Sequence, residues 1–318
     1  MERGHGAPTC VRVLRTQVGR LSSGRDRKEA DITKLLTLNT HSLQEADYEQ
    51  KLSWFLDAVQ KEQPDVLALQ EVSQSVSAPP ADRALLEGLF VCPGQEPVIR
   101  ADNHALRVAC GLREAGIPCS WFWQPIKIGY GKYDEGMALF VLHQEITEAD
   151  SFYTSGCREY DNWKTRKVFG IRGSRCRDWF YTVHMGWWQD EEEPFSAQWQ
   201  RLEQQLLLKK RESRIWLMGD FNSPAGLKGQ GYDCIRSGGW QDTYKLAWEC
   251  DCGATVEGVI DGWEGLKGGQ IPGLGMRIDY IWCSTSAPVR SSKVIFNGKN
   301  EPKISDHFGI LVEIEDHG

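Results

Sequence analysis

No stretch of the sequence approaches the ~20 consecutive apolar residues that a helix needs to cross a membrane. The first residues also lack the apolar segment of a secretory signal. Positive charge is not in excess either, because 37 Lys and Arg stand against 44 Asp and Glu, a formal net charge of −7. These absences lead us to expect no membrane partner and no broad electrostatic binding to nucleic acid.

Zinc and redox motifs are also missing, although the chain has ten cysteines. Only Cys250 and Cys252 lie close together, and a C-x-C pair alone has neither zinc nor disulfide-exchange spacing. Scattered thiols without an export signal are typical of a reducing compartment, so we expect a cytoplasmic protein. Each cysteine is interpreted as a small buried apolar residue rather than a functional one.

What is present is an ordinary globular composition, with 41% apolar and 25% charged residues. Residues 1–31 differ, because they hold seven basic and four acidic side chains and little apolar periodicity. We interpret residues 1–31 as a flexible N-terminal extension. Residues 32–318 then carry a net charge of −10 and are predicted to form a single domain, with oligomeric state left open.

Strand-like and helix-like segments alternate along that domain, which favours an α/β layered fold with mixed sheets. Helical spacing of apolar residues is found over Tyr48–Val59, Ala105–Gly116 and Phe195–Leu208. The glycine-rich stretch Gly258–Met276 is predicted to be a long surface loop. The predicted strands are Ile32–Asn39, Val66–Val72, Cys119–Trp123, Met137–Leu142, Lys167–Ile171, Trp179–His184, Ile215–Met218, Arg277–Trp282, Val289–Phe296 and Phe308–Ile314.

Polar residues follow or precede these strands at six places. They are Asn39, Glu71, His184, Asp220 with Asn222, Asp279, and Asp306 with His307. A single carboxylate after a strand is usually a turn former or a helix cap, but six such places suggest convergence at one rim of a sheet. Carboxylate and amide oxygens suit Mg²⁺ or Mn²⁺, and the two histidines suit acid–base or oxyanion work.

Five of these segments together resemble the endonuclease/exonuclease/phosphatase superfamily. They are Thr37–Asn39, Leu69–Glu71, Gly219–Asn222, Arg277–Tyr280 and Ser305–His307, in the family's order. The resemblance spans residues 32–314 and implies a four-layer α/β sandwich, in which two mixed sheets pack together between helices. It also implies a metal-dependent phosphoric ester hydrolase.

Further segments resemble a bacterial branch that contains maltose 6′-phosphate phosphatases. They are Leu38–Ser42, Ile128–Gly136, Asn162–Lys167, Val183–Trp188 and Val294–Gly298. This branch implies a Mg²⁺-dependent phosphomonoesterase that hydrolyses a sugar phosphate by in-line attack of an activated water. The alternatives are a phosphodiesterase of the same superfamily, either sphingomyelinase-like or a nuclease, and a binding module that has lost catalysis.

The resemblance also implies roles for the polar residues. Metal binding falls to Glu71 and Asn39, with help from Asp306. Asp220 orients or deprotonates the attacking water with the support of Asn222. His307 stabilises the phosphoryl oxygens, and Asp279 holds its ring. His184 contacts the phosphate or helps to protonate the leaving oxygen, and Glu135 either orients His184 or is a turn carboxylate.

Substrate recognition is predicted from the segments shared with the sugar-phosphatase branch. Lys164 and Arg166 are candidates to hold a phosphate dianion, although either could belong to a solvated basic face. Trp187 and the adjacent Trp188 offer flat rings for a sugar, although a tryptophan is more often part of a core. Tyr133, with Tyr130 nearby, offers a hydroxyl to a polar ligand.

Overall fold

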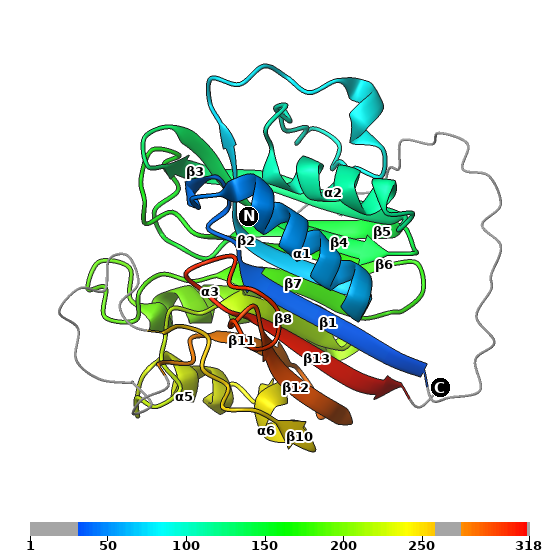
Figure 1. The fold of residues 1–318 in the computed structure, drawn as a ribbon. Coiled ribbons are helices and arrows are strands. Elements are labelled where there is room, and N and C mark those ends of the chain that lie inside the picture. The colour runs from blue at the N-terminus through cyan, green and yellow to red at the C-terminus, as the bar shows by residue number, and fades with distance from the viewer. Residues whose placement is uncertain (1–30, 258–274, 317–318) are drawn as a thin grey trace.

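The computed structural model describes residues 31–257 and 275–316 (Figure 1). Residues 1–30, nearly all of the predicted flexible extension, lie outside the described residues, as does most of the predicted glycine-rich loop. Within the described residues, no helix combines the length and apolar character needed to cross a membrane.

The first sheet has seven strands in the order β10-β12-β13-β1-β2-β4-β3. It is mixed, because β1 pairs parallel with β2 and antiparallel with β13. Its strands are β1 (Asp31–Asn39), β2 (Val66–Ser75), β3 (Cys119–Gly129), β4 (Tyr133–Leu142), β10 (Glu249–Cys250), β12 (Val289–Ile295) and β13 (Gly309–Asp316).

The second sheet has six strands in the order β5-β6-β7-β8-β11-β9. It is also mixed, since β7 and β8 run parallel while β8 and β11 run antiparallel. Its strands are β5 (Ile146–Tyr153), β6 (Lys167–Gly173), β7 (Trp179–His184), β8 (Ile215–Asp220), β9 (Gln241–Asp242) and β11 (Asp279–Cys283).

The two sheets pack face to face because their strands are apolar on both faces. Along β1, Leu35 joins the cluster between the sheets and Leu36 joins the cluster under α1 and α2. In β4, Leu139 and Phe140 alternate in the same way. A strand with two apolar faces needs cover on both sides, which produces a layered sandwich.

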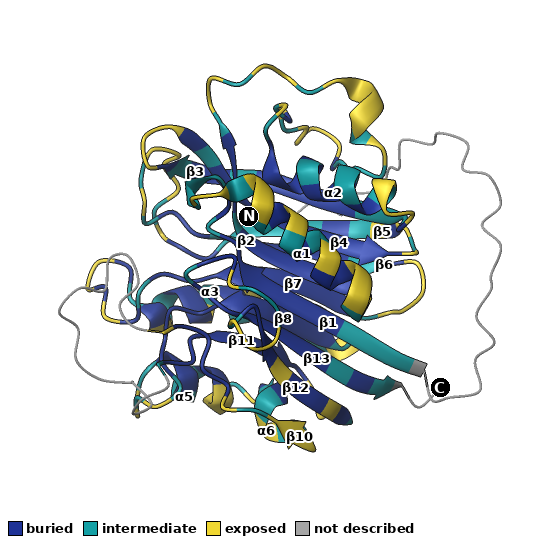
Figure 2. Ribbon diagram, viewed as in Figure 1, coloured by how far each residue is buried: buried dark blue, intermediate teal, exposed yellow. Residues whose placement is uncertain are grey.

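Helices supply the two outer layers, and their inner faces are buried (Figure 2). The first sheet is covered by α1 (Tyr48–Glu62) and α2 (His104–Glu114), and the second by α3 (Phe195–Leu206) and α5 (Gly231–Ser237). Short helical turns complete the chain: η1 (Ser42–Gln44), η2 (Arg83–Leu86), α4 (Lys209–Glu212) and α6 (Thr243–Leu246). The predicted four-layer α/β sandwich is confirmed.

The elements differ from the sequence predictions in a few places. Helix α3 ends at Leu206, and both Leu207 and Leu208 are exposed. Strand β2 continues to Ser75 rather than ending near Glu71. The sequence analysis missed β5, whose polar residues do not form an apolar run, together with the two-residue strands β9 and β10.

Candidate active site

Strand register brings three of the predicted residues together in the second sheet. His184, the last residue of β7, pairs with Asp220, the last residue of β8. Asp279, the first residue of β11, pairs with Asp220 from the other side. Gly219 makes the close approach of β7 and β8 possible, because its φ is 142° and a Cβ there would lie 2.1 Å from the Val183 carbonyl oxygen.

Glu71 reaches the same place from the first sheet, by a route that the sequence did not predict. It lies within β2, where the register with β4 shifts between Leu69 and Val72, and its φ is 52°. Such a bulge re-aims a side chain, and here it directs the carboxylate toward Asn39 at the end of β1. Asn39 Nδ2 donates to Glu71 Oε1 at 2.9 Å and to Asp220 Oδ2 at 3.3 Å, so one amide links the two sheets.

His307 and Asp279 form a buried imidazole–carboxylate pair. His307 Nδ1 lies 3.0 Å from Asp279 Oδ2, and its Nε2 lies 3.8 Å from Asp220 Oδ2. Burial by itself lowers the pKa of His307, but the charges of Asp279 and Asp220 outweigh it and hold the pKa well above its usual range. His307 is therefore an imidazolium that faces Asp220.

Asp220 is held as a weak acid. Burial, and then the neighbouring charge of Asp279, raise the pKa of Asp220 to about 7. The backbone N–H of Asn222 donates to Asp220 Oδ1 at 2.7 Å, and Asn222 Nδ2 donates to the Met185 carbonyl oxygen. A fixed carboxylate with a pKa near neutrality suits a general base.

His184 has the opposite electrostatic environment. Its Nε2 lies 3.7 Å from Asp220 Oδ2 and 3.9 Å from Glu71 Oε1. Burial, and then the cations Arg166 and Lys127, hold the pKa of His184 well below its usual range. Beside Asp220, the pocket therefore holds a charged imidazole, that of His307, and a neutral one, that of His184, an arrangement that separates two proton-transfer roles.

Glu135 does not have the partner predicted for it. Glu135 Oε1 lies 3.1 Å from Lys127 Nζ, whereas the carboxylates near His184 Nε2 are those of Asp220 at 3.7 Å and Glu71 at 3.9 Å. Both Lys127 and Glu135 are buried, so the carboxylate is satisfied by the ammonium that faces it across the β3–β4 pair. We correct the predicted Glu135–His184 pair to a Glu135–Lys127 pair.

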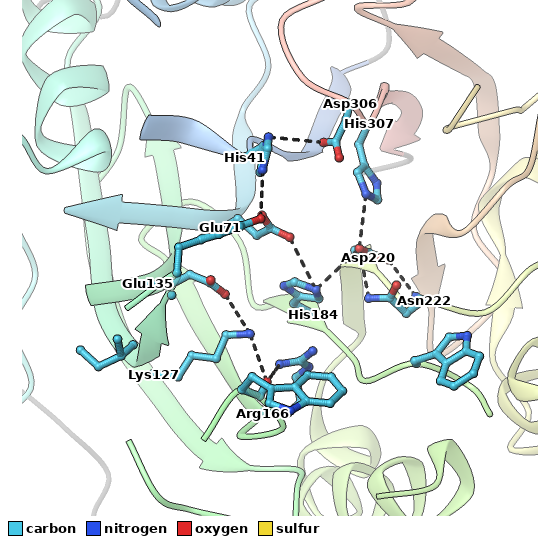
Figure 3. A pocket seen from close by; sticks show the side chains of 15 residues that line it. His41, Glu71, Lys127, Glu135, Arg166, His184, Asp220, Asn222, Asp306 and His307 are labelled. Atoms are coloured by element: carbon cyan, nitrogen blue, oxygen red, sulfur yellow. Dashed lines mark hydrogen bonds and ion pairs between the residues drawn. The ribbon is translucent and has the colours of Figure 1, made fainter. Parts of the chain in front are cut away.

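All of these side chains except Asn39 and Asp279 line one pocket of about 380 Å³ (Figure 3). In the view of Figure 3, His41, Asp306 and His307 lie on one side of His184, and Lys127 and Arg166 lie on the other. Among the described residues, the lining is His41, Glu71, Lys127, Ile128, Gly129, Tyr130, Glu135, Trp163, Arg166, His184, Trp187, Asp220, Asn222, Asp306 and His307.

Only part of the predicted substrate-binding set lies at this pocket. Arg166 and Trp187 line it. Lys164 instead points to two acids, with its Nζ 2.9 Å from Asp190 and 2.7 Å from Glu192. Tyr133 is buried beside the pocket and donates to the Leu43 carbonyl oxygen, and Trp188 packs into the core of the second sheet.

His41 and Lys127 line the pocket and were not predicted. A signal for Lys127 exists, since it is a single cation between Ile126 and Ile128 in a strand-like segment. His41 had no such signal beyond its place in the motif after Asn39. Tyr130 and Trp163 also line the pocket, and their side chains are 56% and 58% exposed.

His41 lies between the carboxylates of the pocket and the exposed Tyr130 at its opening. Its Nδ1 lies 2.9 Å from Glu45 Oε1, and its Nε2 lies 3.2 Å from the Tyr130 hydroxyl. Burial alone would lower the pKa of His41, but the hydrogen bond to Glu45 and the charges of Glu71 and Asp306 raise it to about 9. His41 is therefore a second imidazolium among carboxylates.

The acidic side of the pocket fits a divalent cation. Four carboxylates lie there, together with the imidazolium ions of His41 and His307. The carboxylates are those of Glu71, Asp220, Asp279 and Asp306. Ligand atoms of Asp220, Asp279 and His307 lie within 4.8 Å of one another. Burial, and then the charge of Glu135, raise the pKa of Glu71, so a bound cation would relieve an unfavourable buried charge.

Comparison with known proteins agrees with this geometry. The model of the endonuclease/exonuclease/phosphatase family matches residues 36–307. The chain belongs to this family. Its members hydrolyse phosphoric esters and generally use divalent metals, so the chain is a phosphoric ester hydrolase of the endonuclease/exonuclease/phosphatase family.

Solved structures extend the match over most of the chain. An endonuclease/exonuclease/phosphatase family protein from Leptotrichia buccalis is 30% identical with a TM-score of 0.75, over 89% of this chain and 100% of that one. A mannosyl-6-phosphatase from Bacteroides thetaiotaomicron is 16% identical (TM-score 0.57; 89% and 99% covered). Truncated TDP2 from Caenorhabditis elegans is 14% identical (TM-score 0.54; 90% and 98% covered). The latter two share the fold, and no curated protein sequence matches this chain significantly.

Proposed function

We propose that this family member is a Mg²⁺-dependent phosphomonoesterase that acts on a phosphorylated sugar, with maltose 6′-phosphate as a candidate. One observation carries the proposal. The same pocket holds an acidic side suited to a cation and a basic side formed by Lys127 and Arg166, both buried. A phosphomonoester is a dianion, so it gains from both a metal ion and a protein cation.

The metal ion is assigned to Glu71 and Asn39, with Asp306 at the rim. When bound there, Mg²⁺ would neutralise charge on the phosphate ester. The other steps are proposed for the protein's own groups. Asp220, with its pKa near 7, takes a proton from the attacking water, and Asn222 keeps its carboxylate in place.

The two histidines are assigned to the phosphoryl group. The imidazolium of His307 would donate from Nε2 to a phosphoryl oxygen, while Asp279 holds the ring through Nδ1. The neutral His184 would donate one N–H to another phosphate oxygen near the leaving group. Because its pKa is depressed, His184 is better suited to hydrogen bonding than to full proton donation, so the departing sugar oxygen would take its proton from water in the pocket while Asp220 returns the proton that it accepted to solvent.

We propose that the sugar binds at the opening of the pocket, beside Trp163 and Trp187. Trp163 is largely exposed there, and Trp187 lines the wall. The Trp187 ring offers a flat face against which the apolar face of a sugar could stack. The mannosyl-6-phosphatase from Bacteroides thetaiotaomicron, which shares the fold, supports a sugar phosphate as the substrate class.

We also propose that the enzyme is cytoplasmic. Nucleic acid is disfavoured as its main substrate. The excess of acidic residues disfavours a polyanion held along its length. None of the nine cysteines in residues 31–257 and 275–316 forms a disulfide, which suits a reducing compartment. Fractionation of native cells would test the location.

The direct test is release of inorganic phosphate from a panel of sugar phosphates, with and without Mg²⁺. We expect kcat/KM for maltose 6′-phosphate or glucose 6-phosphate to exceed that for sphingomyelin and for duplex DNA on one enzyme preparation. Faster cleavage of either diester than of both sugar phosphates would replace the phosphomonoesterase with the phosphodiesterase alternative. The family assignment would stand in either case.

A further inference from the structure

Lys127 is an ammonium group placed where a strand would ordinarily carry an apolar side chain. Its side chain is only 10% exposed and lines the active-site pocket. Burial, and then the neighbouring charge of Arg166, lower the pKa of Lys127 below its usual range. Burying a lysine ammonium group costs free energy unless an opposite charge or a ligand pairs with it. The presence of Lys127 in the pocket wall therefore requires an explanation.

Arg166 lies next to Lys127, and the two cations share one acceptor. Arg166 Nη1 donates to the Trp163 carbonyl oxygen at 2.8 Å, and Lys127 Nζ donates to the same oxygen at 3.3 Å. The segment before β6 is thus folded so that two positive charges meet at one carbonyl. Arg166 is 7% exposed, and its Nε is buried without a hydrogen-bond partner among the described residues.

The charges on this side of the pocket do not balance. Two cations face one carboxylate, that of Glu135, which Lys127 contacts at 3.1 Å. Asp220 and Glu71 also act electrostatically on Arg166, but they belong to the acidic side of the pocket, and Asp190, which acts on it less, is paired with Lys164. Within the described residues, Arg166 therefore forms no salt bridge with a carboxylate, and only acids that it does not contact balance its charge.

We propose that Lys127 and Arg166 form a two-cation subsite for a phosphate dianion, and that Lys127 is the residue that selects monoesters over diesters. This inference rests on the proposed function, because it names the group that recognises the extra charge of a monoester. An alkyl or aryl diester carries one negative charge, which a metal ion on the acidic side and Arg166 already meet. The second charge of a monoester is the one that Lys127 compensates.

Glu135 is a positioning residue in this arrangement. It neutralises Lys127 while no ligand is bound, and its backbone pairs with Lys127 in the β3–β4 hairpin. Without Glu135, two adjacent cations would repel each other in a buried wall. The arrangement explains why Glu135 faces Lys127 rather than His184.

The test replaces Lys127 by Met, which keeps the length of the side chain and removes its charge. The probes are glucose 6-phosphate, bis(p-nitrophenyl) phosphate, and inorganic phosphate as a competitive inhibitor. For Lys127→Met we expect KM for glucose 6-phosphate and Ki for inorganic phosphate to rise about tenfold or more, the scale of one lost charge-assisted contact. We expect kcat/KM for the diester to change less than twofold.

Two further variants keep the result interpretable. Lys127→Arg retains the charge and should recover most of the phosphate affinity, which a purely structural role would not explain. The Lys127→Met/Glu135→Gln double variant removes the pair without leaving an unpaired charge, and it should show the same loss if Lys127→Met alone folds poorly. Lys132→Met is the matched control, since Lys132 is exposed on the neighbouring turn and does not line the pocket.

Equal losses on monoester and diester, or an unchanged Ki for inorganic phosphate, would overturn the subsite. The inhibition constant separates this proposal from the proposed function. If the wild-type enzyme prefers diesters, the phosphomonoesterase assignment fails, but the Ki for inorganic phosphate still reports whether Lys127 binds a phosphate dianion.

Discussion

His307 and Asp220 are the two groups whose loss should affect the chemical step most. His307 is kept charged by Asp279 and faces Asp220, whose pKa is about 7. His307→Ala and Asp220→Ala should each lower kcat by ~10²–10⁴-fold, the usual range for acid–base and oxyanion groups. Asp279→Asn should act in the same direction but less strongly, because it removes only the charge behind the ring.

Steady-state kinetics on the best sugar phosphate would measure these effects. His143→Asn is a suitable control, because His143 is exposed and does not line the pocket. Wild-type kcat in His307→Ala would show that the site has been assigned wrongly.

Arg166 and Lys164 are close in sequence but should behave differently. Arg166 lines the pocket, whereas Lys164 is paired with Asp190 and Glu192. Arg166→Ala should raise KM for a sugar phosphate by roughly tenfold or more, which corresponds to a lost contact of ~1.5–3 kcal/mol. Lys164→Ala, the matched control, should leave KM within about twofold of wild type. A larger effect from Lys164→Ala than from Arg166→Ala would contradict the structure.

Helices α1 and α2 are joined by a buried histidine that makes the fold sensitive to acid. His104 Nδ1 lies 2.8 Å from the Tyr48 hydroxyl, and burial, followed by the charge of Arg107, lowers the pKa of His104 to about 3. The unfolded chain takes up this proton near pH 6.5 and the folded chain does not. The contribution of His104 to stability is therefore complete above pH 6.5 and declines as the pH falls toward 3.

His104→Gln removes the titrating group while it leaves an acceptor for the Tyr48 hydroxyl. Urea unfolding midpoints measured from pH 7 to pH 4 should fall less steeply for His104→Gln than for wild type. His143→Asn should keep the wild-type dependence, because His143 is exposed. Identical slopes for His104→Gln and wild type would show that His104 does not contribute to the pH dependence.

The acidic side of the pocket should make the whole molecule respond to divalent metal. The proposed ligands Asn39 and Glu71 come from the first sheet, and Asn39 also donates to Asp220 of the second sheet. A cation that binds only the folded state adds ~2.7 kcal/mol of stability at a hundredfold excess over its Kd. Mg²⁺ should therefore raise Tm in a saturable way, and chelation should abolish turnover.

Glu71→Gln separates metal binding from folding. The variant should retain the metal-free Tm of the wild type within a few degrees, because it loses one charge from a crowded acidic site whose burial raises the pKa of Glu71. It should lose most of the Mg²⁺-induced rise in Tm, measured by thermal melts across a Mg²⁺ titration. Full activity after exhaustive chelation would exclude the metal-dependent mechanism.

Much of the architecture follows from local sequence patterns. Apolar strands such as Leu35–Leu38 are buried on both faces, so they require a layered sandwich whichever strands pair with them. The residues after those strands, such as Asn39 and Asp220, were predicted to meet because strand ends in a sheet converge. Strand β5 was missed because its stability comes from pairing with β6 rather than from an apolar run.

The sequence predicted most of the positions that meet at the pocket, because strand periodicity and strand ends are local properties. It could not assign partners, which depend on contacts between distant segments. The bulge that redirects Glu71 arises from the register between β2 and β4. The salt bridge of Glu135 to Lys127 depends on the pairing of β3 with β4. The different surroundings of Arg166 and Lys164 depend on the conformation of the loop that carries both. The tertiary structure decides which charged side chains line the pocket and which form salt bridges elsewhere, because both depend on how distant segments pack together.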